Sequence, residues 1–336
     1  MDKRITIKDI AKELNIHHST VSRALRNDTR VNDKTRDTVL DYAREHNYQA
    51  NMNAIQLRGT KNNAIALIVP NINHSFFSDI ISLLSNFAYQ KGFVISVFQS
   101  NENYELEKEI VNTIIQHNFA GVIVSIAQNT TNSDHFALLK KFGIPLVFFD
   151  RVCEELSTPM VLINNYDVTF EATEYLISKG YKKIVHITGT ETINVFRNRQ
   201  NGYIKALEKH DIEYINAINI TDDFSVPVGK EMLSSLWNSD NRPDAIISSS
   251  IHLTMGILLE ARKLDIHVPT NLGIITFGTL LTAEILQPAI TSIEQPEKEI
   301  AEVAFNLLLK LMNKEIKIDS NIIEEVKAKI KFKESC

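Results

Sequence analysis

The chain has 336 residues, of which 44% are hydrophobic, and its net charge is -5 at neutral pH. This length exceeds one average domain, and the apolar content can fill more than one core. The sequence has no run of about 18 apolar residues and no hydrophobic leader after Met1, so we expect a soluble, cytoplasmic protein with no membrane partner. Its two cysteines, Cys153 and Cys336, indicate neither a disulfide framework nor a metal cluster.

Three short helices are predicted in the first 46 residues. Apolar residues recur at helical spacing near 7–14, 18–26 and 33–46, and polar residues occupy the positions between them. Asn15 supplies a turn between the first two helices, and Asn32 can cap the third. Two helices joined by a tight turn form a helix-turn-helix, whose second helix can enter the major groove of DNA.

The distribution of charge supports DNA binding at this end of the chain. Residues 1–61 carry 12 Lys and Arg against 8 Asp and Glu, whereas the remaining residues carry 24 against 33. The basic excess therefore lies where the helix-turn-helix pattern lies, as attraction to phosphates requires.

Beyond residue 62, apolar runs alternate with amphipathic segments. The runs predict buried parallel strands, and the helices between them predict βαβ units in doubly wound parallel sheets. The predicted strands span 64–69, 93–98, 121–124 and 145–149 in a first set and 183–187, 217–220, 245–248 and 272–277 in a second. The predicted helices span 75–90, 103–117, 134–142, 167–179, 199–210, 227–237 and 254–264.

Several motifs are similar to those of a known family. In the N-terminal region they are Thr6-Ile7-Lys8-Asp9-Ile10-Ala11, Ser19-Thr20-Val21-Ser22-Arg23-Ala24-Leu25, Val31-Asn32-Asp33-Lys34-Thr35-Arg36 and Asn47-Tyr48. The chain resembles the LacI/GalR family of bacterial transcription repressors, and the resemblance continues through 288–296 and 330–335. It implies a small all-α helix-turn-helix headpiece, followed by an α/β two-lobed periplasmic-binding-protein-like sensor domain.

The resemblance also implies a domain organisation. The headpiece would span 1–50, a hinge helix and linker 51–61, and an effector-binding and dimerisation domain 62–336. The chain would cross between the lobes near 161–164, 289–293 and 318–322. Lobe 1 would then contain about 62–161 and 293–320, and lobe 2 about 162–290 and 321–336.

Ten residues match positions that the family uses at DNA. His18 and Ser19 take the recognition-helix positions that meet base edges, and Arg23 can reach a guanine or a phosphate. The other seven supply backbone-positioning hydroxyls, the cap of the second helix and the hinge with its minor-groove leucine: Thr6, Thr20, Ser22, His17, Asn51, Ala54 and Leu57. The chain departs from the family at His17, a weaker cap than Ser or Thr, and at Ala50, where a proline is usual. An ordinary linker role for Leu57 is the alternative.

Seven residues are expected to line an effector site between the lobes, at strand ends that face the cleft. By the resemblance they are Phe76, Phe77, Asp150, Arg151, Arg199, Phe224 and Gly278. Asn164, Ile251 and Gly278 stand where many sugar-responsive members carry acidic residues. Two arginines without those carboxylates favour an anionic effector, such as a sugar phosphate or sugar acid. The alternatives are that Arg151 pairs with a structural carboxylate and that the aromatic residues are ordinary core.

The predicted function is that of a transcriptional regulator, most simply a repressor, that binds a palindromic operator in double-stranded DNA as a homodimer and responds to a small-molecule effector. Activation, or a dual role, is the alternative within the family. A solute-binding protein would share the two-lobed fold but would not need residues 5–58. Neither a G-x-G-x-x-G nor a G-x-x-x-x-G-K-[ST] nor a G-x-S-x-G motif occurs, so we expect no enzymatic activity and no cofactor.

Overall fold

The computed structural model describes residues 5–46, 48, 62–213, 218–220, 224–240, 242–278 and 280–336. The predicted hinge residues Asn51, Ala54 and Leu57 lie outside these ranges, as does Ala50. The chain divides into two compact units, Met1–Asn62 and Asn63–Cys336, and each has a hydrophobic core of its own. Within the described ranges, no helix combines the length and the apolar character needed to span a membrane.

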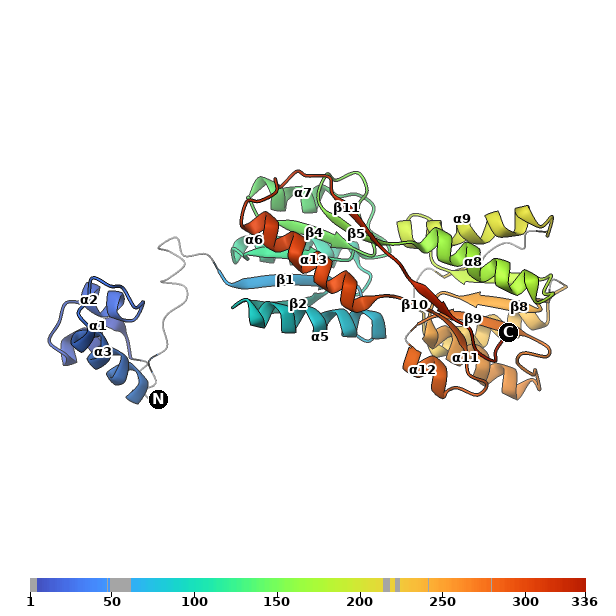
Figure 1. The fold of residues 1–336 in the computed structure, drawn as a ribbon, viewed down its shortest axis with the longest axis horizontal. Helices are drawn as coiled ribbons and strands as arrows, with labels where there is room; N and C mark the ends of the chain where they lie inside the picture. The colour runs from blue at the N-terminus through green and yellow to red at the C-terminus, as the bar shows by residue number, and fades with distance from the viewer. Residues whose placement is uncertain are drawn as a thin grey trace. The chain divides into compact units, whose positions relative to one another are not determined.

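The first unit contains the three predicted helices (Figure 1). They are α1 (Ile7–Glu13), α2 (His18–Ala24) and α3 (Asp33–Glu45). Ile10, Val21, Ala24 and Val39 are fully buried between them. Because helices this short are marginal in isolation, their shared apolar core is what stabilises them.

Polar side chains set the starts of α1 and α3. Thr6 and Asp9 form a capping box, in which the Thr6 hydroxyl accepts from the Asp9 amide at 3.3 Å and the Asp9 carboxylate accepts from the Thr6 amide at 2.9 Å. Asn32 caps α3, as the sequence predicts, by accepting from the Thr35 amide at 2.8 Å. Each cap gives a partner to amide groups that the first helical turn leaves without one.

The second unit consists of two lobes, each built on a six-stranded sheet (Figure 1). The elements of lobe 1 are β1 (Ala64–Val69), α5 (Ser75–Gln90), β2 (Val94–Gln99), α6 (Tyr104–Gln116), β3 (Gly121–Val124), α7 (Asp134–Lys141), β4 (Leu146–Phe149), β5 (Met160–Ile163), α13 (Glu297–Met312) and β11 (Ile323–Val326). Its strand order is β11-β5-β4-β3-β1-β2, and all neighbours are parallel. This is the predicted doubly wound arrangement.

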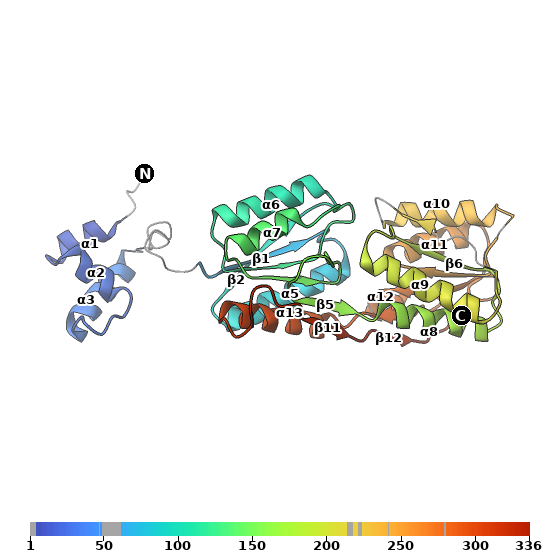
Figure 2. The same ribbon diagram turned by 90° about the horizontal axis from the view of Figure 1, so that it is seen from above.

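Alternate residues of the lobe 1 strands face opposite helical layers. In β1, Ile65 and Leu67 belong to the core formed with α5 and α13, whereas Ala66 and Ile68 belong to the core formed with α6 and α7. Figure 2 shows these two pairs of helices on opposite faces of the sheet. Both faces of the sheet are therefore buried, which explains why β1 is a continuous apolar run in the sequence.

Lobe 2 repeats the scheme with an antiparallel edge. Its elements are α8 (Asn165–Ser178), β6 (Ile184–Thr188), α9 (Asn194–Lys209), β7 (Ile218–Asn219), α10 (Val226–Trp237), β8 (Ala245–Ser248), α11 (Ile251–Lys263), β9 (Gly273–Phe277), α12 (Leu280–Ile285), β10 (Thr291–Glu294) and β12 (Lys329–Lys331). The strand order is β12-β10-β9-β8-β6-β7. The sheet is parallel except for β12, which pairs antiparallel with β10.

The chain changes lobes three times, and two of these crossovers lie later than predicted. The first falls at Asn164, between β5 and α8, within the predicted 161–164. β10 pairs with β9 in lobe 2, so the second crossover follows Glu294 and corrects the predicted 289–293. β11 pairs with β5 in lobe 1, so the third follows Val326 and corrects 318–322. β11 has no apolar run because it is a mostly exposed edge strand, and β10 has none because its buried residues include the polar Thr291 and Ser292.

The start of α9 is the largest error among the predicted helices. The helix begins at Asn194, five residues before the predicted 199. Val195 and Phe196 in its first turn are buried against the core of lobe 1, not that of their own lobe. A helical repeat of apolar residues is visible in a sequence when one face of the helix is buried along its whole length. The first turn of α9 packs on lobe 1, so its apolar residues do not continue the repeat of the rest of the helix.

Helices α10 and α11 approach each other closely at two glycines. A Cβ added to Gly256 would overlap the carbonyl oxygen of Val226, and one added to Gly229 would overlap that of Leu253. We expect Gly256→Val to lower the free energy of unfolding by about 3 kcal/mol, because backbone atoms cannot move aside as a side chain can. Leu259→Ala, an exposed change on the same helix, should stay within about 0.5 kcal/mol in the same urea titration. Equal midpoints for both variants would contradict this packing.

Glu297, the first residue of α13, gives the fold a pH dependence. Burial, and then the nearby charges of Asp79 and Glu294, raise its pKa from 4.5 to about 7. The folded protein therefore holds this proton more tightly than the unfolded chain does. The resulting stability is fully present below pH about 4.5 and is lost as the pH rises through about 7. Glu297→Gln should gain unfolding free energy over the wild type at pH about 8 and show little difference at pH about 4.5; a difference independent of pH would contradict the assignment.

Candidate functional site

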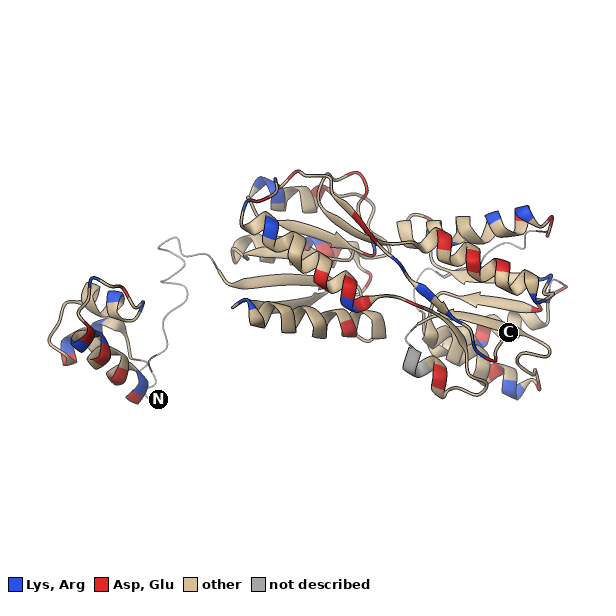
Figure 3. Ribbon diagram, viewed as in Figure 1, with Lys and Arg blue, Asp and Glu red and all other residues tan. Residues whose placement is uncertain are grey.

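Helix α2 has the charge distribution of a DNA-reading helix. It contains Arg23 and no acidic residue, whereas α3 mixes acidic and basic residues (Figure 3). His17 caps α2 through Nδ1, which accepts from the Ser19 amide at 3.3 Å. Helix α2 can therefore approach a phosphate backbone without presenting a charge that repels it.

Four of the predicted DNA-contact residues are accessible on α2. His18 and Arg23 are exposed, and Ser19 and Thr20 are half-buried. The Arg23 guanidinium makes no hydrogen bond or ion pair with any residue that the structure describes. The Ser19 hydroxyl donates to His17 Nδ1 at 2.8 Å, which leaves its oxygen lone pairs to accept from another donor.

The hydroxyls of Thr6 and Ser22 already have partners within the headpiece. Thr6 Oγ1 donates to Asp9 Oδ2 at 2.6 Å. Ser22, whose hydroxyl the resemblance assigns to the DNA backbone, has a side chain that is buried beneath Arg26. Arg26 Nε donates to the Ser22 carbonyl at 3.0 Å, and Arg26 Nη2 donates to Ser22 Oγ at 3.3 Å. These contacts hold the turn after α2.

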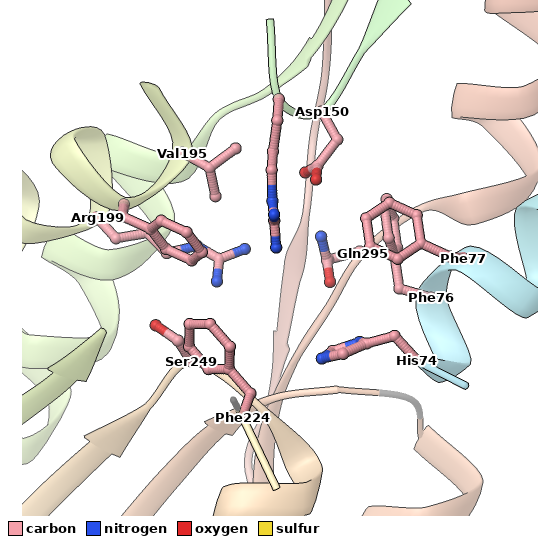
Figure 4. A pocket seen from close by; sticks show the side chains of 11 residues that line it. His74, Phe76, Phe77, Asp150, Val195, Arg199, Phe224, Ser249 and Gln295 are labelled. Atoms are coloured by element: carbon pink, nitrogen blue, oxygen red, sulfur yellow. The ribbon is translucent and has the colours of Figure 1, made fainter. Parts of the chain in front are cut away.

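Eleven residues from both lobes enclose a cavity, which we call the Arg199 cavity (Figure 4). They are His74, Phe76, Phe77, Asp150, Arg151, Val195, Phe196, Arg199, Phe224, Ser249 and Gln295. Six of the seven residues predicted for the effector site are among them. Gly278 is not: a Cβ at this position would lie 2.8 Å from Ile251 Cβ, so it packs against α11.

Asp150 is the carboxylate of the cavity. It follows β4 with a φ of 58° and is fully buried, and its Oδ1 has no hydrogen-bond partner among the described residues. Burial raises its pKa, and the positive charges of Arg151 and Arg199 oppose that rise. A buried acceptor left unpaired is costly, so a ligand that donates to Asp150 would recover this free energy.

Arg199 is the main positive group of the cavity. Its Nε donates to Asn165 Oδ1 at 2.8 Å, and its guanidinium lies 3.4 Å from the centre of the Phe277 ring. Burial lowers its pKa to about 9, so it stays charged near neutral pH. Figure 4 shows the ends of Arg199, Asp150, Gln295 and His74 directed toward a common centre. The site thus offers a fixed donor fork facing an acceptor.

Arg151 does not add a second unpaired positive charge. Its Nη1 donates to both carboxylate oxygens of Glu102 at 2.9 Å. This confirms the alternative in which Arg151 pairs with a structural carboxylate. The sequence could not show the pair, because the two residues are 49 positions apart. Of the two arginines that favoured an anionic effector, Arg151 is therefore neutralised by Glu102.

Aromatic rings form two walls of the cavity. Phe76 and Phe77 lie edge to face with ring centres 5.1 Å apart, and Phe196 and Phe224 are stacked at 5.5 Å. Phe76 and Phe77 are also buried in the core of lobe 1, so the same two side chains pack in the core and line the cavity.

Besides His74, which lies just before the predicted Phe76 and Phe77, four lining residues were missed from the sequence. Ser249 follows the predicted strand 245–248, and the rule that ligands bind beyond carboxyl ends of strands could have found it. Gln295 follows β10, which was not predicted, and Val195 and Phe196 lie in the unpredicted first turn of α9. Within the described residues, no group of three or more His, Cys, Asp or Glu side chains could hold a metal ion.

The lobes are closed on the Arg199 cavity. Its volume is about 40 Å³, which suits about three water molecules at roughly 10–15 Å³ each and not a metabolite. Asn194 of lobe 2 joins lobe 1 twice: its Nδ2 donates to the Asp150 carbonyl at 3.0 Å, and its Oδ1 accepts from the Val152 amide at 3.1 Å. Gln128 Nε2 donates across the lobes to the Ile220 carbonyl at 2.9 Å. A larger ligand therefore requires the lobes to rearrange.

Comparisons with known proteins agree with both units. Residues 6–51 match a family model described as bacterial regulatory proteins, lacI family, and residues 173–336 match a periplasmic binding protein-like domain. Catabolite control protein A of Priestia megaterium is 28% identical over 98% of this chain and 99% of its own. The HTH-type transcriptional repressor CytR of Escherichia coli K12 is 29% identical over 91% of this chain and 89% of its own.

A solved structure extends the likeness to the whole fold. The lac repressor dimer bound to operator and the anti-inducer ONPF superposes with a TM-score of 0.86 at 20% identity and covers 99% of both chains. The headpiece, the two-lobed sensor and their order along the chain are thus shared with proteins that are DNA-binding transcriptional regulators. In both of its units the chain is therefore similar to bacterial transcriptional regulators of the lacI family.

Proposed function

We propose that the protein is a dimeric repressor that binds an inverted-repeat operator and changes its affinity for DNA when a small molecule occupies the Arg199 cavity. The main support is that one chain combines an exposed Arg23 on α2 with a buried Asp150 oxygen that lines a cavity with Arg199 between two lobes. Among the residues that the structure describes, neither the Arg23 guanidinium nor this oxygen has a hydrogen-bond partner. CytR is named a transcriptional repressor, and the lac repressor was solved as an operator-bound dimer, which supports both parts of the proposal. Such a regulator acts in the cytoplasm, where the chromosome lies.

A dimer follows from how a helix-turn-helix reads DNA. One recognition helix covers one half-site, so two-fold symmetry of the protein matches the symmetry of an inverted repeat. The edge strand β2 leaves Val94 and Val97 exposed, and Tyr89 at the end of α5 is 84% exposed. Exposed apolar groups of this size favour a protein interface. Sedimentation velocity should give the dimer without DNA, and a monomer at micromolar concentration would contradict this step.

The charges of the Arg199 cavity favour a hydroxyl-rich, sugar-derived ligand with at most one negative group. Arg199 can donate to a hydroxyl or acid oxygen while Asp150 accepts from a neighbouring hydroxyl. Asp150 offsets the charge of Arg199, and Glu102 offsets that of Arg151, so the site does not balance a doubly charged phosphate. The aromatic walls suit the apolar face of a sugar ring.

The test is selection of bound sequences by the full-length protein from a randomised duplex pool, with and without an added metabolite extract. We expect enrichment of an inverted repeat in the absence of the extract and a weaker enrichment in its presence. Stronger enrichment of the repeat in the presence of the extract would mean that the small molecule promotes DNA binding, as a co-repressor does, and does not release the protein from DNA. Failure to enrich any sequence under either condition would remove specific DNA reading and leave a sensor alone.

A further inference from the structure

A second hollow between the lobes is far larger than the Arg199 cavity and shares no lining residue with it. Its volume is about 590 Å³, against about 40 Å³ for the Arg199 cavity. We call it the interlobe groove. Residues within 126–132 and 152–155 of lobe 1 and within 190–193 of lobe 2 line it. Small-molecule sites usually occupy about 300–1,000 Å³, so the groove alone among these two can hold a metabolite without movement of the lobes.

The groove lies where the topology places ligands. Its three lining segments directly follow β3, β4 and β6, which are parallel strands of the two sheets. Ligands of open α/β sheets bind beyond the carboxyl ends of such strands. A molecule in the groove would touch both lobes at once.

The lining residues of the groove disfavour anionic ligands. Hydroxyls and amides predominate, including Thr131 and Asn129, which are exposed. The charged lining residues are Glu154 and Glu155, and no Lys, Arg or His is among the lining residues. Glu154 is paired with Arg197, whereas Glu155 has no ion pair with any residue in the described part of the chain. An anionic ligand would meet the unpaired carboxylate without a cation to balance it.

Apolar and hydrogen-bonded contacts separate the groove from the Arg199 cavity. Ile193 and Val152 line the groove and are buried in one cluster with Phe196, which lines the cavity. Between them, Asn194 bonds to the Asp150 carbonyl and the Val152 amide. Cys153 on the groove wall is inert, because burial raises the pKa of its thiol and keeps it protonated.

We propose that the interlobe groove is a second effector site, which binds a hydroxyl-rich molecule without negative charge and stabilises the closed arrangement of the lobes. The site goes beyond the ligand proposed for the Arg199 cavity and does not depend on it. Hydroxyls and amides of the groove exchange hydrogen bonds with sugar hydroxyls, and Glu155 accepts from a hydroxyl or a protonated amine. Because the groove is formed by both lobes, its ligand binds the closed state and shifts the population toward it.

The test uses the full-length protein without DNA and measures its melting temperature with glucose, glucosamine or glucose 6-phosphate at millimolar concentration. We expect glucose and glucosamine to raise the melting temperature in a concentration-dependent way and glucose 6-phosphate to raise it less. Thr192→Trp should fill the groove and remove the shift. Glu155→Lys should weaken glucosamine at least about tenfold and glucose much less, since only the amine pairs with the carboxylate.

Glu171→Lys is the matched control, because it makes the same charge change at an exposed position of α8 outside the groove. It should respond to all three compounds as the wild type does. The proposal is overturned if glucose and glucosamine leave the wild type unshifted, if glucose 6-phosphate is the strongest ligand, or if Thr192→Trp and Glu155→Lys keep the wild-type shift. Operator binding is measured separately, so a negative result for the groove as an effector site would not contradict the proposed repressor function.

Discussion

Arg199→Ala is expected to abolish the response of operator binding to the ligand of the Arg199 cavity while the ligand-free protein still binds DNA. Asn165 and the Phe277 ring hold the Arg199 guanidinium in place before any ligand arrives. The ligand therefore meets a preorganised donor and does not bear the cost of ordering it. Removing one partner of a buried, charged hydrogen-bonded pair costs about 2–5 kcal/mol, which corresponds to a loss of roughly 30-fold or more in ligand affinity.

The measurement is release of labelled operator, followed by fluorescence anisotropy, as the ligand concentration rises. Lys205→Ala, an exposed change on the same helix, is the control and should titrate as the wild type does. Arg199→Lys keeps the charge but loses the planar fork, so it should recover only part of the affinity. An unchanged titration for Arg199→Ala would place the ligand elsewhere.

Local patterns predicted the elements whose burial is regular along the segment. The strands β1 and β3 are apolar runs because helices cover both faces of their sheet, and the helices of the headpiece show a single apolar stripe because they have one core. Two of the six cavity residues identified by resemblance follow the same logic, since Asp150 and Arg151 lie just beyond a strand that the sequence marks clearly.

The features that the sequence missed all depend on contact between distant segments. Val195 and Phe196 are buried by the other lobe, and β10 and β11 have places in their sheets that only the strand order defines. Glu102, positioned after β2, neutralises Arg151 and so changes the charge of the cavity. No periodicity or motif records such pairs, so the sequence alone could not indicate the net charge of the cavity.

Arg23→Ala is expected to lower affinity for the selected operator by about 5- to 150-fold, the range that corresponds to about 1–3 kcal/mol for a bidentate arginine contact to a guanine. The side chain is exposed in the last turn of α2 and has no hydrogen bond or ion pair within the described part of the chain, so it is available to DNA. The headpiece should stay folded, because Val21 and Ala24 carry the core of this helix and are unchanged.

The comparison of cognate and scrambled duplexes, titrated at several salt concentrations, decides what Arg23 contacts. A base contact predicts a larger loss on the cognate duplex and relaxed preference at one position of each half-site. A phosphate contact predicts an equal loss on both duplexes and a salt slope reduced by about one. Arg44→Ala on α3 is the matched control, since Arg44 is exposed and pairs with Asp41 at 3.4 Å, and it should leave the preference between duplexes unchanged. If both variants lose affinity equally and without sequence dependence, α2 does not read bases, and the specificity of the protein must come from elsewhere in the chain.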